Sequence, residues 1–244
     1  SPLTTAGAVA QCLAESMVSC AITQLVRPGS PAVLGSFISS MSLRTGSPTF
    51  GTPEPALGSL AMGQLARRLQ LPLRCAGNFS TSKLPDGQAM QQAMMSMMSA
   101  VQCGANFILH SAGFLDGLLS MSYEKFMLDA DLCGALHAYL KGFEVNEDTL
   151  GFEALAEGGP GQHLFATQHT LRHYQSAYWD SAMDDQQPWE TWDEQGGIDA
   201  ATRANNRWKA QLASYQAPYM DPGTDEALQE FISKTKTAMP DAWY

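Results

Sequence analysis

Three short apolar runs in the first half of the chain are each followed at once by aromatic or polar side chains. Phe37 closes the first run, Asn78 and Phe79 follow the second, and His110 closes the third. Small residues stand beside them, which lets a ligand come close to the backbone. Aromatic faces attract cations and an imidazole forms hydrogen bonds, so these side chains suit the binding of a small ligand. Ordinary packing, or a hydrogen-bonded core role for His110, is the alternative interpretation.

The apolar runs alternate with segments whose apolar residues recur at helical spacing. This pattern predicts helices over residues 6–26, 53–69, 85–103 and 123–140, and buried strands over residues 32–37, 72–77 and 106–110. A repeat of about forty residues is typical of parallel βα units whose helices cover the sheet. The predicted fold class is therefore α/β, as a doubly wound sheet or a (β/α)8 barrel, and in both folds ligands bind just past the strand ends.

The turns after the three strands lack the glycine patterns of nucleotide-binding loops. Neither G-x-G-x-x-G nor G-x-x-x-x-G-K-[ST] occurs there, so dinucleotide and P-loop functions lose their main support. Glu54 and Tyr123 begin predicted helices, where capping explains them without a ligand, although a substrate role is the alternative. His163 follows a glycine-rich turn and could line a site. Its spacing of six from His169 is wrong for two zinc ligands on one helical face, so we expect no metal.

Composition restricts the classes of partner. The formal net charge is -10 and the basic residues are scattered, which argues against nucleic-acid binding. The five cysteines include no C-x-x-C pair, so we expect buried thiols in a reducing cytoplasm and neither a zinc site nor a disulfide framework. We expect no membrane span, because we expect no apolar run of the eighteen or so residues that a span needs, and residues 1–26 lack the basic start of a signal peptide. Ser1 leads almost directly into helix, which suggests an excised piece.

The pattern of helices and strands in the sequence changes near residue 144. Residues 146–148 start a helix, residues 158–161 break it, and residues 199–217 and 223–238 have the pattern of amphipathic helices. We therefore predict two parts. Residues 1–143 would form the βα units, and residues 144–244 would form a helical extension that packs on them.

Ten stretches of the chain, in order and nearly end to end, resemble the trimethylamine and glycine-betaine methyltransferase family. They are residues 24–29, 50–54, 64–67, 82–88, 104–106, 122–126, 159–164, 168–171, 203–205 and 208–209. Members of this family form a (β/α)8 TIM barrel and are about twice as long as this chain. The resemblance implies that the chain supplies the later βα units of the barrel and the C-terminal extension. A half barrel exposes two sheet edges, so we expect pairing with another copy or an altered edge.

The resemblance also implies a reaction. Such enzymes move a methyl group from a quaternary or tertiary methylamine to the Co(I) of a corrinoid (cobalamin) that a cognate corrinoid protein carries. The cobalt is the nucleophile, so no catalytic triad is needed, and none is evident. The site would hold a cation and aim its methyl group, with Phe79, Phe37 and His110 as candidates. The trimethylamine enzyme carries pyrrolysine in the loop that matches residues 77–80, where Phe79 is the best match, so non-pyrrolysine relatives such as glycine-betaine methyltransferases are the better guide.

Two other functions remain open at the sequence level. The chain could be a non-catalytic module that binds the corrinoid protein or oligomerises. It could also be a different (β/α)8 enzyme, such as an aldolase or a decarboxylase. That enzyme would need a Schiff-base lysine or a metal cluster at a strand end, and the nearest lysine, Lys83, lies in a polar loop.

Overall fold

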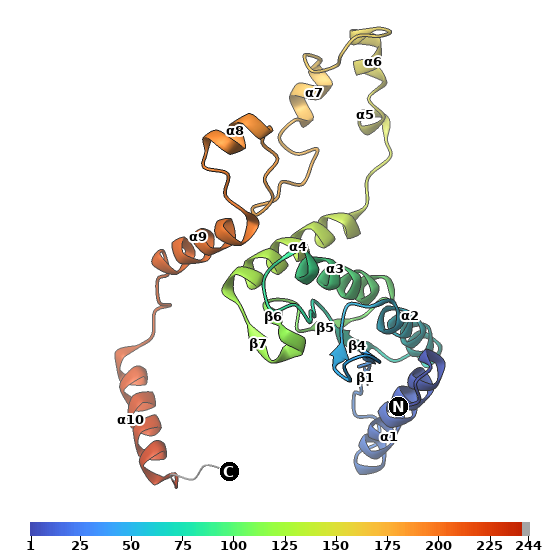
Figure 1. The fold of residues 1–244 in the computed structure, drawn as a ribbon, viewed down its shortest axis with the longest axis vertical. Coiled ribbons are helices and arrows are strands. Elements are labelled where there is room, and N and C mark those ends of the chain that lie inside the picture. Colours follow the sequence, from blue (N-terminus) through green and yellow to red (C-terminus); the bar gives the residue numbers. More distant parts are fainter. Residues whose placement is uncertain (241–244) are drawn as a thin grey trace. The chain divides into compact units, whose positions relative to one another are not determined.

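The computed structural model describes residues 1–240 and contains two compact units (Figure 1). The first unit comprises Ser1–Trp208, and the second begins at Lys209. Residues 144–208 thus belong by contact to the unit that holds the βα region. The predicted boundary between residues 143 and 144 stays a prediction about domain organisation.

The predicted alternation of helices and strands is confirmed. The elements are α1 (Thr5–Val26), β1 (Leu34–Gly35), α2 (Pro53–Arg68), β4 (Leu73–Ala76), α3 (Gly87–Gln102), β5 (Phe107–Leu109) and α4 (Tyr123–Lys141). The three strands form a parallel sheet in the order β1-β4-β5, which is the order in which they occur in the chain. The fold is therefore mixed α/β with a small parallel sheet, while a complete eight-stranded barrel is not shown.

The helices begin where short polar side chains accept backbone hydrogen bonds. The Asp86 carboxylate accepts from Ala89 N at 2.9 Å and starts α3, and the Ser122 hydroxyl accepts from Lys125 N at 3.2 Å and starts α4. Pro53 stands in the first turn of α2, where its missing N–H costs nothing. These local signals explain why the sequence alone located the four helices.

The two faces of the sheet have different surroundings. One face packs against the helices through a core of Leu34, Met62, Ala66, Leu73, Cys75, Ala100 and Cys103. Consecutive strand residues point to opposite faces, so Gly35, Arg74 and Phe107, which are paired across the strands, lie on the other face. That face is open, since Phe107 is 58% exposed.

The close packing of the helix layer depends on a glycine. Helices α1 to α4 lie one beside the next along the covered face of the sheet (Figure 1). A Cβ at Gly63 of α2 would lie 2.2 Å from the carbonyl oxygen of Cys103, so a side chain there would push α2 away from the end of α3. The five cysteines are free thiols, and Cys75 and Cys103 are buried in this layer.

Two short antiparallel hairpins were not predicted. The first pairs β2 (Ser40–Met41) with β3 (Pro48–Thr49), and the second pairs β6 (Phe114–Leu115) with β7 (Ser120–Met121) around the 3-10 turn Asp116–Leu118. Strands of two residues are too short to show the alternation by which a strand is recognised in a sequence. These hairpins place Phe50 and Phe114 beside the strand ends.

Residues 144–208 form short helices, namely α5 (Glu147–Leu150), α6 (Phe152–Gly158), α7 (Gln168–His173) and α8 (Trp189–Glu194), followed by α9 (Ala200–Ala213). The predicted start at residues 146–148 is confirmed, with the Asn146 side chain accepting from Thr149 N at 2.9 Å. The predicted single helix is interrupted by Gly151, whose positive φ of 62° ends α5. Leu128 of α4 packs with Met183 and Ala204, so part of this region does pack on the βα region.

The second unit contains the helix α10 (Pro222–Ala238), which agrees with the predicted amphipathic helix over residues 223–238. The Asp221 carboxylate accepts from Thr224 N at 3.0 Å and caps it. Leu228, Phe231 and Ile232 of α10 are exposed.

The expectation that no segment is long and apolar enough to cross a membrane was wrong for α1. Its 22 residues meet that test by length and composition, although serine, threonine and glutamine interrupt the apolar run. One such helix is weak evidence for a membrane span, because core helices and signal sequences pass the same test. Val9, Cys12 and Leu13 of α1 pack against the core of the βα region.

Candidate functional site

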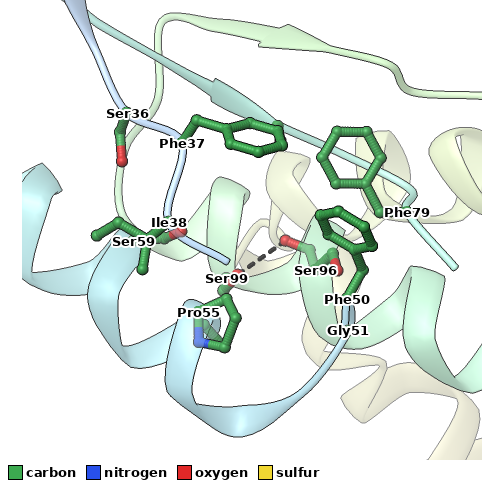
Figure 2. A pocket seen from close by; sticks show the side chains of 12 residues that line it. Ser36, Phe37, Ile38, Phe50, Gly51, Pro55, Ser59, Phe79, Ser96 and Ser99 are labelled. Carbon is green, nitrogen blue, oxygen red and sulfur yellow. Dashed lines mark hydrogen bonds between the residues drawn. The ribbon is translucent and has the colours of Figure 1, made fainter. Parts of the chain in front are cut away.

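Five rings gather at the C-terminal ends of the three parallel strands. We call Phe37, Phe50, Phe79, His110 and Phe114 the aromatic cluster. Phe79 lies at its centre, with ring centroids 5.8 Å from Phe37, 5.2 Å from Phe50 and 5.1 Å from His110. Most of the pairs are edge-to-face, the arrangement that aromatic rings prefer. Figure 2 shows Phe37, Phe50 and Phe79 together.

The cluster is buried on one side and open on the other. Phe79 and Phe50 are 3% and 6% exposed, whereas Phe37 is 46% exposed. The pocket that these three rings help to line has a volume of about 30 Å³, which is room for a water molecule and not for a methylated amine. A ligand of that size would therefore meet the cluster from the side on which Phe37 is exposed.

The loop after β4 is built to hold Phe79. Gly77 N donates to Leu109 O of β5 at 2.8 Å, and a Cβ at Gly77 would lie 2.9 Å from Met97 Cε. Beyond Phe79, Gln92 Oε1 of α3 accepts hydrogen bonds from Ser80 Oγ at 3.0 Å and Thr81 N at 2.9 Å. The close approach at Gly77 and the Gln92 anchor fix both sides of the loop.

His110 has an uncommon backbone conformation and an unpaired polar atom. Its φ is 57°, a left-handed value that costs free energy in a residue with a side chain. Its Nδ1 is buried and has no hydrogen-bond partner within residues 1–240. Burial, and secondarily the Arg74 cation, lower the pKa of His110, so the ring is neutral at pH 7. A neutral imidazole with a free nitrogen can still donate or accept one hydrogen bond to a ligand.

Asn78 directly precedes Phe79 in the chain and is fully buried. Its Nδ2 donates to Ser111 O at 2.7 Å and so ties the loop after β4 to the loop after β5. Its Oδ1 is buried without a hydrogen-bond partner among the described residues. Asn78 therefore joins two loops of the site and leaves one acceptor free.

Arg74 is a further candidate for the site, and the sequence interpretation missed it. It lies on the open face of the sheet, between Gly35 and Phe107 in the strand register. No carboxylate of the described chain forms an ion pair with it. Strand parity gave a usable signal, because the buried neighbours Leu73 and Cys75 assign Arg74 to the opposite face. Phe50 and Phe114 were missed because each follows or begins a strand of only two residues.

The remaining sequence candidates lie elsewhere. Glu54 is exposed in the first turn of α2, and His163 is exposed and stacks on Phe165 at 5.6 Å. Tyr123 stacks on Trp208 at 4.9 Å, beside a Glu124 carboxylate that accepts from Asn205 Nδ2 and Trp208 Nε1. The structure thus brings Phe37, Asn78, Phe79 and His110 together, and it does not bring the other three candidates to them.

A second group of histidines lies on the surface. We call Asp148, Glu153, His169, Arg172 and His173 the surface histidine network. Possible ligand atoms of Asp148, His169 and His173 lie within 4.8 Å of one another. His169 and His173 are one turn apart on α7, a spacing that the sequence interpretation did not consider. Arg172 forms ion pairs with both Asp148 and Glu153, so a cation already occupies the carboxylates.

Comparison with known proteins gives the same family along the whole described chain. A family profile described as trimethylamine methyltransferase (MTTB) matches residues 1–240. Glycine betaine methyltransferase of Desulfitobacterium hafniense (strain Y51) is 36% identical over 233 residues, covering 96% of this chain and 48% of the relative. Trimethylamine methyltransferase MttB of Methanosarcina barkeri (strain Fusaro / DSM 804) is 30% identical over 98% of this chain and 48% of the relative.

A third relative is named after a different substrate. Proline betaine:corrinoid methyltransferase of Eubacterium limosum is 28% identical over 95% of this chain and 48% of the relative. The chain spans about half the length of the curated relatives that it matches. Because the family profile covers nearly all of the sequence, the chain belongs to the trimethylamine methyltransferase (MTTB) family.

Proposed function

We propose that this chain carries part of the substrate site of a cytoplasmic methyltransferase. The reaction would move a methyl group from a quaternary amine such as glycine betaine to the Co(I) of a corrinoid that a cognate corrinoid protein carries. The observation that carries the proposal is the aromatic cluster at the C-terminal ends of parallel strands, where α/β folds bind their ligands. Membership of the family and the names of the relatives support it.

The chemistry of the cluster suits a quaternary ammonium group. A cation over an aromatic face gains about 0.5–2 kcal/mol, and several edges and faces meet around Phe79. The amine that remains after methyl transfer is neutral, so this chain need not supply a general acid. The partner's corrinoid would supply the nucleophile. What the chain must do is hold the cation in one orientation, which can itself lower the barrier substantially.

Two polar groups favour the binding of a substrate that also carries a carboxylate. Arg74 is a cation without an ion-pair partner among the described residues, and it lies close enough to His110 to lower the pKa of that ring. The neutral His110 has a free nitrogen. A guanidinium binds a carboxylate with two parallel hydrogen bonds. We therefore favour betaines, which carry both charges, over trimethylamine, which lacks the carboxylate.

The open face of the sheet supports the wider architecture that the resemblance implies. Phe107 and Val33 are exposed there, at 58% and 54%. We propose that further strands complete a (β/α)8 barrel around this face in the whole protein, and that the protein is a homo-oligomer. Exposed apolar side chains on a sheet face are typical of surfaces that another layer covers.

The test is calorimetric titration of the intact protein with glycine betaine, choline and tetramethylammonium. We expect glycine betaine to bind best, because only it offers both a trimethylammonium group and a carboxylate. Arg74→Gln should reduce the preference for glycine betaine over choline by about tenfold, or about 1.4 kcal/mol. The matched control is Arg68→Gln, since Arg68 is exposed at the end of α2 and lies outside the site.

Two results would count against the proposal. Absence of binding across the panel would favour the alternative of a non-catalytic module for corrinoid-protein binding or oligomerisation. An unchanged preference in Arg74→Gln would remove Arg74 from the site and leave the aromatic cluster to be tested by itself.

A further inference from the structure

A buried ion pair in α4 contacts the loop that follows β5. Lys125 and Asp129 are one turn apart on α4, and both side chains are fully buried. Lys125 Nζ is hydrogen-bonded to Asp129 Oδ1. Neither residue belongs to the aromatic cluster, and the proposed reaction uses neither of them directly.

The stability of the fold does not by itself explain this pair. Removing two charges from water is unfavourable, and apolar residues of similar volume often serve as well or better. Burial lowers the pKa of Lys125, and burial raises the pKa of Asp129 to about 6 in spite of the neighbouring lysine. Both shifts oppose the ionised pair. The pair is therefore better explained by what its second carboxylate oxygen does.

That oxygen holds the loop after β5. Asp129 Oδ2 accepts a hydrogen bond from Gly113 N at 2.8 Å, across 16 residues of sequence and in a buried position. Gly113 has a φ of 90°, and a Cβ there would lie 3.0 Å from Met121 Cε. A residue with a side chain would be strained at this φ, and the Gly113 N–H is directed at α4.

A second set of contacts fixes the same loop two residues earlier. The Ser111 carbonyl accepts from Asn78 Nδ2 at 2.7 Å and faces the Cys133 thiol of α4 at 3.7 Å. The Gly113 carbonyl accepts from Ser122 N at 3.0 Å. The loop is therefore held by the loop after β4 on one side and by α4 and its N-cap on the other.

Both ends of this loop belong to the aromatic cluster. His110 precedes the held residues and Phe114 follows Gly113 directly. Their rings lie 5.1 Å apart, and each also contacts Phe79. His110 keeps a positive φ, which a free loop would relax. A displacement of Gly113 would therefore move two of the five rings.

We propose that Asp129 is a positioning residue for the substrate site, acting through the Gly113 amide on the rings of His110 and Phe114. Lys125 orients the carboxylate by engaging Oδ1, which leaves Oδ2 directed at Gly113. The consequence for amine binding rests on the proposed function. The effect on the placement of the His110 ring does not.

The test compares two double variants in the intact protein. Lys125→Met with Asp129→Asn removes both charges and keeps an oxygen that can accept from Gly113 N. Lys125→Met with Asp129→Leu also removes both charges, keeps the same branching and number of side-chain heavy atoms, and has no acceptor. Any general effect of losing the ion pair is common to both variants, so their difference reports on the Gly113 contact, with leucine the bulkier of the two side chains.

Two readouts are needed. The first is the NMR titration of His110 in protein labelled at histidine Cε1, with His110→Gln assigning the resonance. The second is the affinity for glycine betaine by calorimetry. We expect the Asn variant to resemble the unaltered protein within about twofold. We expect the Leu variant to show a changed His110 resonance and about tenfold weaker binding. Unchanged values of both in a folded Leu variant, or equal losses in the two variants, would overturn the proposal.

The two proposals can fail separately. If the unaltered protein binds no amine, the proposed function fails, and the His110 resonance still decides whether Asp129 positions the ring. If the Leu variant does not fold, Asp129→Glu takes its place, because it keeps a carboxylate beside Lys125 and displaces the acceptor by one methylene. A His110 resonance unchanged in Asp129→Glu would then overturn the proposal.

Discussion

Histidines occur in two regions of this molecule with opposite surroundings. In the aromatic cluster, His110 lies among phenylalanine rings with its Nδ1 buried and unpaired among the described residues. In the surface histidine network, His169 Nε2 lies 2.9 Å from the Asp148 carbonyl oxygen. His173 Nε2 lies 3.0 Å from Asp148 Oδ2, an electrostatic contact whose geometry is not that of a hydrogen bond.

The difference lies in whether the local charges and polar atoms are already compensated. At the surface, Arg172 bridges Asp148 and Glu153, and all three side chains are about half exposed. In the cluster, the Nδ1 of His110 has no hydrogen-bond partner within residues 1–240, and the backbone of His110 is in an unfavourable conformation. The nearby Arg74 has no ion-pair partner among the described residues. Uncompensated groups in a buried site are expected where a ligand completes them. Grouping of histidines alone would have selected the surface histidine network.

The largest expected difference between the two regions concerns stability. Lys125→Ala should lower the free energy of unfolding by about 3–5 kcal/mol, because it leaves Asp129 buried without its partner. Arg172→Ala at the surface should lower it far less, because solvent screens that pair. Denaturant unfolding of both variants measures this, and equal losses would contradict the contrast between a buried support and a surface network.

Ligand binding should separate the regions next. Phe37→Leu keeps an apolar side chain and removes the ring that the cluster leaves exposed, so it should weaken glycine betaine binding by about 0.5–2 kcal/mol, or roughly two- to thirty-fold. Phe165→Leu is the matched control, since Phe165 is 80% exposed and lies outside the cluster. Calorimetry decides between them. If both variants bind as the unaltered protein does, Phe37 does not contact the substrate.

The contact between Glu124 and α9 is partly buried, and its strength should depend on pH. Hydrogen bonds from Ser122, Trp208 and Asn205 lower the pKa of Glu124 to about 2 from 4.5. The stabilisation by this carboxylate is therefore complete above about pH 4.5 and is lost as the pH falls toward 2. The effect should be modest, because the carboxylate is only partly buried and solvent screens part of the interaction.

The measurement for this contact is the NMR resonance of the Trp208 indole N–H, which donates to Glu124 Oε1 at 2.8 Å. We expect it to shift between about pH 4.5 and pH 2 in the unaltered protein, and to stay flat in Glu124→Gln. A resonance that shifts equally in both would show that another group titrates there.

The smallest expected effect concerns metal binding at the surface histidine network. We expect protein purified without chelators to contain no stoichiometric zinc there, because Arg172 already engages the Asp148 carboxylate. Elemental analysis of the unaltered protein and of His173→Ala measures this. Zinc that is present at one equivalent and lost in His173→Ala would reverse the comparison and make this network a metal site.

Local patterns in the sequence located most of the βα region. Apolar periodicity placed the four helices, and short apolar runs placed the three strands. Phe37, Asn78, Phe79 and His110 were chosen because they follow these strands. The hairpins were missed because they depend on pairings of two residues each, and Phe50 and Phe114 were missed with them.

The sequence by itself thus determined which segments are helices and strands and which side chains stand at the strand ends, since both follow from the order of neighbouring residues. Only the tertiary structure decided which rings meet at Phe79, that Arg74 has no ion-pair partner among the described residues, and that Asp129 reaches Gly113. These contacts join residues that are distant in the chain. They depend on strand order, register and helix packing, which local periodicity does not encode.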